Sequence, residues 1–469
     1  MVRPHIVVVG GGFAGFTTLR RLEQRLGQRT PADITLITPD DYMLYQPLLP
    51  QVASGLVTPQ SIAVSLYRRL SRTRIVPGKA VGVDAASQMV LVRTIAGETT
   101  AVGYDRLVLA PGSMTRALDI PGLTAYGHGN KNLAEAVYLR DHALAQLELS
   151  DASHDPRERE ERCRFIVVGG GYSGVETAAT MALLCSEAAR RYPDIAPNID
   201  WHLIDIAPRL LPELGEDLGN RAMAVLRKRG VNVELGVSVS NITEREVTLT
   251  DGRTLPCRTL IWTAGVAPSP LMEATGLPTD RGKLKVRADL SVPGHPEILA
   301  IGDSAAVPDL SAHEDHAACP PTAQVATRQG PVAADNVIAS LRGEPLTDFH
   351  HRDLGLVVDL SGKDAVARPF GFELSGLPGL AVTRAQHLIS LPSGPARARV
   401  AANWAIRYLL GGEVSRLGFA LNSVDSFADD DARDQYLTAE QVRQEAATAP
   451  LRGFASDASS TPSGQRQHR

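Results

Sequence analysis

The chain has 469 residues, of which 43% are hydrophobic, so it is long enough for two or three globular domains with ordinary cores. Its formal net charge is −4 and no nucleic-acid-binding motif is present, so a nucleic acid is not an expected partner. The four cysteines, Cys163, Cys185, Cys257 and Cys319, form no CxxC pair, which argues against a disulfide framework and predicts no metal site.

Targeting signals are not recognisable in the sequence. The first apolar stretch is too short and wrongly flanked for a signal peptide. No stretch approaches the ~18 apolar residues that would predict a transmembrane helix. We therefore expect the chain in the cytoplasm, either free or on a membrane face.

A strand, a glycine-rich turn and a helix occur near the N-terminus and again near residue 164. The G-x-G-x-x-G glycines are Gly10, Gly12 and Gly15 in the first copy and Gly169, Gly171 and Gly174 in the second. In this motif the first glycine makes a tight turn, the second lets the backbone approach a pyrophosphate, and the third lets the helix pack on the strand. Two copies predict an α/β fold with two Rossmann-like units, each binding a dinucleotide.

The second strand of each copy is expected to end near the ribose of its nucleotide, where an acid commonly binds the hydroxyls. In the second copy Asp205 lies at this strand end. An acid there favours NADH, because it would repel the 2′-phosphate of NADPH. Arg209 follows four residues later and keeps NADPH open, because an arginine can accommodate that phosphate.

In the first copy Thr38 and Pro39 stand where the acid is expected. Thr38 can still bond a ribose hydroxyl through its side-chain oxygen. Asp40 and Asp41 come slightly later, and we interpret them as a solvated turn.

Three further apolar strands end in turns of small residues, at Tyr104–Ser113, Thr259–Ser269 and Glu297–Ala305. The first two are typical of crossings between two nucleotide-binding units. The third ends in Gly302 and Asp303. A carboxylate at such a strand end can bond the ribityl hydroxyls of a flavin, but Asp is also a favoured helix cap, so both interpretations stay open.

These motifs resemble those of the two-dinucleotide flavoproteins, and among them the type II NADH dehydrogenases, which are single-chain NADH:quinone oxidoreductases. The likeness covers roughly residues 4–425 and includes GGGFAG, GGGYSGVE, DIAPRLLP and AIGDSA. Its most specific stretches are DYMLYQPLLPQVASG and PPTAQVATRQG.

The resemblance implies non-covalent FAD in the first unit, NADH as substrate in the second, and a quinone as electron acceptor. It implies FAD contacts at Gly10, Gly12, Phe13, Ala14, Gly15, Thr38, Pro39, Gln46, Val81, Ala110, Gly112, Ser113, Gly302, Asp303, Ala323 and Gln324. It implies NADH contacts at Gly169, Gly171, Tyr172, Ser173, Gly174, Glu176, Asp205, Arg209, Ala264 and Gly265.

Three residues are predicted to serve the reaction itself: Glu176, Gln324 and Arg328. The resemblance places Glu176 near nicotinamide and flavin, although an acid in the first turn of a helix is favoured by the helix dipole in any case. Gln324 and Arg328 lie one helical turn apart, on an otherwise apolar segment that suits a flat, lipophilic quinone.

The sequence departs from the family pattern at three places. Thr38 stands where many members have an acid, Arg328 replaces the first terminal glutamine of AQxxxQQ, and Ala110–Gly112 reads APG instead of ATG. None of these changes removes the flavin site, but Arg328 bears on acceptor geometry.

The expected chemistry needs few side chains, because flavin and nicotinamide carry it. One alternative is an enzyme like sulfide:quinone oxidoreductase, which needs cysteines beside the flavin; only Cys319 is expected near it. Another alternative is a slow-turnover NADH sensor of the apoptosis-inducing-factor type.

The expected FAD domain comprises residues 1–120 and 295–345, and the NADH domain residues 121–294. Residues 346–425 form a C-terminal region with a short hairpin at 355–374 and amphipathic helices. Between Leu380 and Ala420 there are five arginines and one glutamate. We expect residues 380–425 to bind the cytoplasmic face of a membrane peripherally, or to pack on the body or on a second subunit in a homodimer. Residues 426–469 are poor in large apolar groups and predict a disordered tail.

Overall fold

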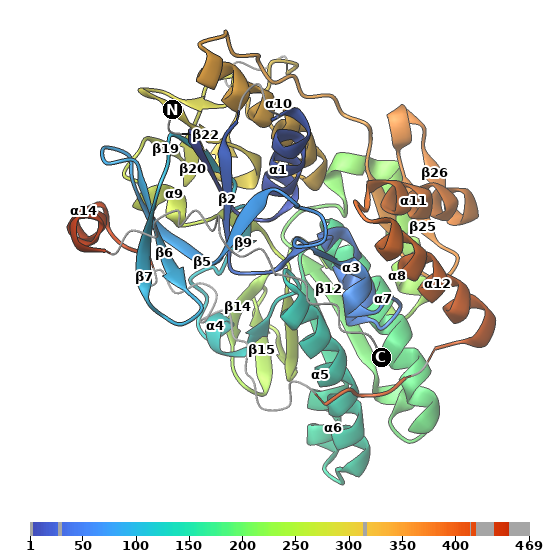
Figure 1. Cartoon of the computed structure of the whole chain (residues 1–469). Coiled ribbons are helices and arrows are strands. Elements are labelled where there is room, and N and C mark those ends of the chain that lie inside the picture. The colour runs from blue at the N-terminus through green and yellow to red at the C-terminus, as the bar shows by residue number, and fades with distance from the viewer. Residues whose placement is uncertain (1–2, 27–30, 313–316, 413, 419–435, 450–469) are drawn as a thin grey trace, which may run out of the picture.

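The computed structural model of the chain describes residues 3–26, 31–312, 317–412, 414–418 and 436–449. Two large sheets, each built around parallel strands, form the body, and two helices near the end of the chain pack beside them (Figure 1). This confirms the predicted α/β class with two Rossmann-like units.

The first sheet has β1 and β2 in its middle. Its strands, in spatial order, are β21 (Ser291–Val292), β22 (His295–Ala300), β8 (Arg106–Leu109), β1 (His5–Val9), β2 (Asp33–Thr38), β5 (Thr73–Asp84), β6 (Met89–Thr94) and β7 (Thr99–Gly103). The strands from β22 to β5 pair in parallel, whereas β6 and β7 extend β5 as an antiparallel meander. The four central strands are apolar and buried, as expected of a parallel sheet that is covered by helices.

Helices α1 (Phe13–Arg25) and α10 (Ala323–Arg342) lie side by side on this sheet (Figure 1). Their contact is close at Gly330, where an added Cβ would lie 2.1 Å from Oγ1 of Thr17. Arg21 on α1 donates two hydrogen bonds, of 3.0 and 2.7 Å, to the carboxylate of Asp335 on α10. The N-termini of both helices are thereby held at one edge of the sheet.

The second sheet is all parallel. Its strands, in spatial order, are β10 (Gly127–His128), β17 (Thr259–Trp262), β11 (Arg164–Val168), β12 (Asp200–Asp205) and β13 (Val231–Leu235). Helices α5 (Leu133–Ala152), α7 (Tyr172–Ala188) and α8 (Glu216–Lys228) belong to this unit. A separate antiparallel sheet comprises β14 (Val239–Ile242), β15 (Glu246–Leu249) and β16 (Thr254–Pro256).

The two units are joined where the chain crosses between them. β9 (Ser113–Thr115) leaves the first unit, β18 (Val266–Pro268) leaves the second, and the two pair antiparallel. Each crossing follows directly on a turn that was predicted to touch a nucleotide. The crossings therefore bring the carboxyl ends of both parallel sheets toward each other.

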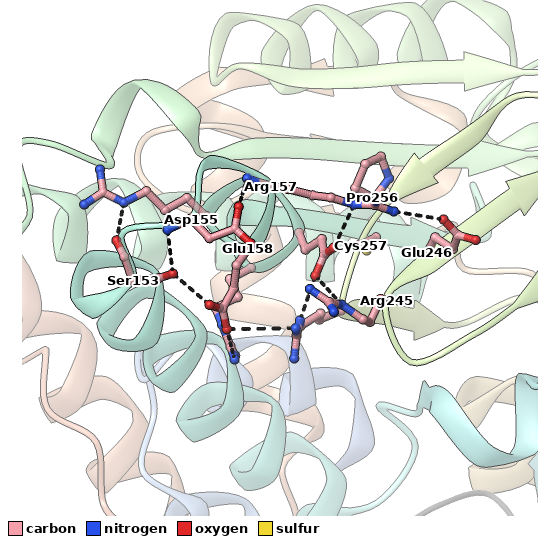
Figure 2. A network of polar contacts seen from close by, with 12 residues as sticks. Ser153, Asp155, Arg157, Glu158, Arg245, Glu246, Pro256 and Cys257 are labelled. Carbon is pink, nitrogen blue, oxygen red and sulfur yellow. Dashed lines mark hydrogen bonds and ion pairs between the residues drawn. The ribbon is translucent and has the colours of Figure 1, made fainter.

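A polar network joins α6 (Pro156–Cys163) to the small sheet of β14–β16 (Figure 2). At its centre the carboxylate of Glu161, which is fully buried, accepts hydrogen bonds from Arg245 at 2.9 Å and Arg258 at 3.2 Å. Since α6 leads into the amino end of β11, this network lies at the end of the strand opposite to the glycine turn. We interpret it as structural.

The C-terminal region begins with a small antiparallel sheet of β24 (Val357–Asp359), β25 (Ala365–Ala367) and β26 (Leu374–Ser375). Helices α11 (Gly376–Ser390) and α12 (Gly394–Leu410) follow. On α12, Val400 and Trp404 are buried against the body, whereas Tyr408 is exposed. Among the described helices, none combines the length and apolarity needed to span a bilayer.

The predicted disorder of residues 426–469 is wrong for part of that segment. Helix α14 (Ala439–Thr448) packs on β5 and β6 and buries Leu437, Val442 and Ala446 (Figure 1). Polar composition suggested disorder, but these apolar side chains fit a patch on the meander. The other residues of the predicted tail lie outside the described ranges.

The remaining short elements connect these layers. They are β3 (Tyr42–Leu44), β4 (Ala63–Ser65), β19 (Thr279–Asp280), β20 (Lys283–Lys285), β23 (Ala305–Ala306), α2 (Leu49–Ala53), α3 (Pro59–Ile62), α4 (Leu123–Tyr126) and α9 (Leu271–Ala274).

Candidate functional site

A cavity of about 390 Å³ lies at the carboxyl ends of the first sheet. The predicted FAD residues that line it are Gly10, Gly12, Phe13, Ala14, Thr38, Pro39, Gln46, Ala110, Gly112, Ser113, Gly302, Asp303 and Ala323. They come from the segments after β1, β2, β3, β8 and β22, from the start of α1 and from the start of α10. Parallel strands with a common polarity bring these separate segments to one edge, as in other open α/β sheets.

The three glycines of the first turn are required for different structural reasons. Gly10 has φ of +98°, and an added Cβ would lie 2.2 Å from the carbonyl oxygen of Ala110. At Gly15 an added Cβ would lie 1.9 Å from the carbonyl oxygen of Gly10. At Gly12, by contrast, a Cβ would meet nothing within 4 Å among the described atoms. Gly10 and Gly15 are thus required by the fold, while Gly12 leaves space on the cavity wall.

The N-terminus of α1 is suited to an anion. Gly12 is the N-cap residue, and no side chain in the described structure caps this helix. The first N–H groups of a helix lack partners within the helix and carry the positive end of its dipole. The pyrophosphate of a dinucleotide can accept hydrogen bonds from these N–H groups and carries the negative charge that the helix dipole favours, so this end of the cavity fits FAD.

Asp303 sits in a hydrogen-bonded cluster at another part of the wall. Ser113 Oγ donates to Asp303 Oδ2 at 2.6 Å, and Lys131 Nζ donates to Ser113 Oγ at 3.1 Å. Burial lowers the pKa of Lys131, whereas Asp303 and Glu135 act in the opposite direction. Asp303 therefore faces the cavity and a lysine, which supports a ligand role more than a capping role.

Two residues, one that lines this wall and one that supports it, were missed by sequence reasoning. Lys131 lines the cavity beside Gln46, whose side-chain amide donates to the Lys131 carbonyl at 3.1 Å. Gln329 is buried, and its Oε1 accepts from Gly302 N at 2.7 Å, so it fixes the turn before Asp303. Gln329 belongs to the quoted PPTAQVATRQG stretch, where its amide could have been noticed; Lys131 carries no motif.

The wall beyond β2 contains Asp40, which had been interpreted as part of a solvated turn. It is exposed to solvent but also lines the cavity, next to Thr38 and Pro39. Lys79, from β5, lies on the same part of the wall, since Pro77 pairs with Thr38 in the sheet register. An acid is therefore present at this part of the wall, two residues after the end of β2.

Three predicted FAD residues do not line the cavity. Gly15 packs under the turn, as described above. Val81 does not line the cavity, because its side chain is buried in a separate cluster under α14, so an FAD contact at Val81 stays a prediction. Gln324 points to the loop before β24, where its Nε2 donates to Gly355 O at 3.3 Å and its Oε1 accepts from Leu354 N at 3.5 Å.

Arg328 shares this face of α10 with Gln324, as predicted, and donates to the carbonyl oxygen of Arg352. The two side chains therefore brace one loop, residues 352–355, against the helix whose N-terminus reaches the cavity.

The second unit repeats the glycine geometry. An added Cβ on Gly174 would lie 1.8 Å from the Gly169 carbonyl oxygen, while Gly171 has no described atom within 4 Å of such a Cβ. Asp205 ends β12, and its carboxylate accepts from Gly170 N and from Ala207 N. The acid thus lies directly beside the glycine turn.

The other predicted NADH residues surround this turn. Tyr172 and Ser173 begin α7, and Ala264 and Gly265 follow β17, with φ of +95° at Gly265. Arg209 is exposed in the segment after β12.

Glu176 lies one turn into α7 and is buried. Its Oε1 accepts from the backbone N–H of Asp359 at 2.8 Å. The Asp359 carboxylate accepts from Gln51 Nε2 at 2.9 Å, and Gln51 Oε1 accepts from Trp404 Nε1 at 2.7 Å. This chain of hydrogen bonds connects Glu176 with α12, and sequence spacing gave no sign of it.

Burial raises the pKa of Glu176 well above its usual value; the Asp359 N–H bond opposes the rise and the Asp359 carboxylate adds to it. Burial also raises the pKa of Asp359, opposed by hydrogen bonds from Ser361 and Gln51 and by Arg384 and Arg229. Two acids that tend to hold protons thus meet beside the second glycine helix. Buried acids with raised pKa values are suited to holding and transferring protons.

Comparisons with known proteins agree with this geometry. Residues 4–330 match the family described as pyridine nucleotide-disulphide oxidoreductase. The chain is 30% identical to the type II NADH:quinone oxidoreductase Ndh of Mycobacterium tuberculosis, over 87% of this chain and 88% of that protein. It is 32% identical to the demethylphylloquinone reductase NdbB of Synechocystis, over 87% of this chain and 97% of that protein.

A solved structure, NDH2 from Plasmodium falciparum in complex with NADH, has the same fold. Its TM-score is 0.81 at 20% identity, covering 88% of this chain and all of that chain. The chain therefore belongs to the pyridine nucleotide-disulphide oxidoreductases and, within them, to the type II NADH:quinone oxidoreductases.

Proposed function

We propose that this protein oxidises NADH and reduces a quinone through a non-covalently bound FAD. When bound, FAD supplies hydride uptake from NADH and delivery of two electrons to the acceptor. The observation that carries the proposal is the cavity at the first glycine turn, lined by Asp303, Ser113 and Lys131, with a second glycine turn and Asp205 across the β9–β18 crossing.

In this proposal the side chains and backbone of the protein bind and orient FAD and NADH, and they hold protons near the reaction site. The N-terminus of α1 holds the pyrophosphate of FAD, and Asp303 with Ser113 holds the ribityl chain. Asp205 holds the adenosine ribose of NADH and disfavours NADPH. Glu176 holds a proton close to the reaction site, and Gln324 with Arg328 shapes the acceptor side through loop 352–355.

Stopped-flow spectroscopy tests the proposal directly. We expect rapid bleaching of the flavin by NADH, slower bleaching by NADPH, and rapid reoxidation by a soluble quinone from a panel that includes ubiquinone and naphthoquinone types. A long-lived reduced complex with almost no turnover would instead identify an NADH sensor. Absence of flavin from the purified protein would contradict the proposal at its base.

The state of Cys319 argues against sulfide oxidation. This cysteine lies a few residues before Ala323, which lines the cavity. Cys319 is buried, its Sγ donates to the Pro308 carbonyl at 3.7 Å, and burial raises the pKa of this thiol to about 12. A thiol in this state is a poor nucleophile, because the thiolate is the reactive form.

Gln324→Ala is expected to slow flavin reoxidation by quinone about tenfold, ~1.4 kcal/mol in the barrier, and to change flavin reduction by NADH less than about twofold. The reason is that the amide holds loop 352–355 on the acceptor side through its contacts with Leu354 and Gly355. Thr327→Ala is the matched control, since Thr327 is exposed on the same helix. Equal slowing of both half-reactions would remove Gln324 from the acceptor site.

Peripheral membrane binding is proposed to use the end of α12. Ile406, Leu409 and Leu410 are exposed, and their spacing places them on one side of the helix. The opposite side is fixed to the body, because Arg407 pairs with Glu187 and Trp404 binds Gln51. An apolar stripe held outward by the body suits the surface of a bilayer.

The double substitution Leu409→Glu and Leu410→Glu is expected to reduce co-flotation with anionic lipid vesicles about tenfold. Turnover with a soluble quinone should stay the same, since both residues point away from the body. Ile95→Glu is the control, because Ile95 is 78% exposed in the meander, away from α12. Unchanged flotation of the double variant would exclude this stripe as the binding surface.

A further inference from the structure

The segment Tyr436–Thr448, which we name the C-terminal strap, is seated on the outer face of the β5–β7 meander. Its helix α14 begins with a capping box, in which Thr438 Oγ1 accepts from Gln441 N and Gln441 Oε1 accepts from Thr438 N. Leu437, Val442 and Ala446 of the strap are buried against Val81, Leu91 and Ala101, which are all 0% exposed. These three meander residues form a cluster apart from the main core and would face solvent without the strap.

The strand below the strap is shaped to receive it. Ala80 pairs with Val92 and Gly82 with Leu91, so Val81 is the extra residue of a β-bulge. The Val81 carbonyl accepts a hydrogen bond from Leu437 N at 3.0 Å. At Gly82 an added Cβ would lie 2.3 Å from Val442 Cγ2, so the absence of a side chain admits the helix. Backbone and side-chain fit together indicate a specific docking site.

The strap also reaches the wall of the cofactor cavity. The Nζ of Lys79 lies 4.6 Å from the ring centroid of Tyr436, within the range of a cation–π contact. Lys79 lines the cavity on β5, next to the segment Thr38–Asp40 that follows β2. In a Rossmann unit the end of the second strand faces the adenosine of the nucleotide. Tyr436 therefore fixes a cation at the adenosine end of the FAD site.

We propose that the C-terminal strap retains FAD: Tyr436 holds Lys79 at the adenosine end of the cavity, and the docked helix holds the β5 bulge in place. Tyr436 is a positioning residue here, since it acts through Lys79. The inference rests on the proposed FAD site and adds to it a segment far away in sequence.

The test measures the release of FAD, followed by the rise of flavin fluorescence after dilution of the full-length holoprotein. Val442→Asp places a charge in the apolar cluster, and Gly82→Val displaces Val442 from the strand side, so both undock the strap by independent routes. We expect each to release FAD about tenfold faster than the natural chain. Tyr436→Leu should accelerate release about threefold with the strap still docked.

Two variants serve as matched controls. Gln444→Asp adds the same charge on the exposed face of α14, and Tyr436→Phe keeps the aromatic ring. Both should release FAD at the natural rate. Natural release rates in Val442→Asp and Gly82→Val would overturn the proposal, while a natural chain that purifies without flavin would overturn the FAD site itself.

Discussion

Replacing Gly12 with alanine is expected to give a folded protein whose affinity for FAD is about a hundredfold lower, a loss of ~2.7 kcal/mol. The backbone at Gly12 has φ of −73° and ψ of −165°, which alanine adopts without strain. A Cβ there meets no described atom within 4 Å. It would instead occupy the space where the backbone approaches the pyrophosphate. The flavin absorbance per protein absorbance after gel filtration measures the loss.

Gly15→Ala is a useful comparison for Gly12→Ala, because we expect it to lower folding stability and not only the affinity for FAD. Its Cβ would lie 1.9 Å from the Gly10 carbonyl oxygen, so α1 must move away from the strand. The expected cost is about 1–3 kcal/mol of folding free energy, visible as a lower unfolding temperature even without FAD. Gly171→Ala supplies a second control, since it should weaken NADH binding and leave flavin content intact. Natural flavin content in Gly12→Ala would contradict the placement of the pyrophosphate at α1.

The glycine turns and Asp303 could be placed from the sequence because their requirements are local. A tight turn with φ of +98° at Gly10 and a helix packed on a strand at Gly15 both demand glycine, whatever the rest of the chain does. The carboxyl ends of parallel strands then bring such turns together by topology alone. This is why predictions for residues as distant as Gly12 and Asp303 converge on one cavity.

The parts that could not be predicted depend on contacts between distant segments. Gln51 and Trp404 are hydrogen-bonded across more than three hundred residues, and neither has a motif. Val442 of the strap packs against Gly82, a contact that composition cannot reveal. The polar composition of the strap therefore suggested disorder. Val81 was assigned to the cofactor for its position in the family pattern, whereas the bulge turns its side chain toward α14.

Glu176→Gln is expected to slow quinone reduction by about a hundredfold, the lower end of the range for losing a proton donor or acceptor. Flavin reduction by NADH should change much less, because hydride transfer needs no proton from the protein. The amide can still accept from Asp359 N, so β24 should keep its place. A loss of equal size in both half-reactions would indicate a binding role for Glu176 instead.

The same variant should change how stability depends on pH. Burial raises the pKa of Glu176, so the folded protein holds a proton that the unfolded chain releases above about pH 4.3. The contribution of Glu176 to the free energy of unfolding is therefore highest below that pH and falls as the pH rises toward the folded pKa, by up to ~1.4 kcal/mol per unit. Since glutamine cannot ionise, the variant should gain stability relative to the natural chain as the pH rises above about 4.3 toward the folded pKa of Glu176.

The groups around Glu176 permit this assignment. His387 on α11 stays neutral, because burial lowers its pKa to about 4, and burial raises the pKa of Tyr45. Burial raises the pKa of Asp359 as it does that of Glu176, so Asp359→Asn should remove only part of the pH dependence. Glu344→Gln, at an exposed glutamate beyond α10, is the control and should leave the unfolding profile unchanged. Parallel unfolding curves for Glu176→Gln and the natural chain across this pH range would mean that the carboxyl is ionised in the folded protein.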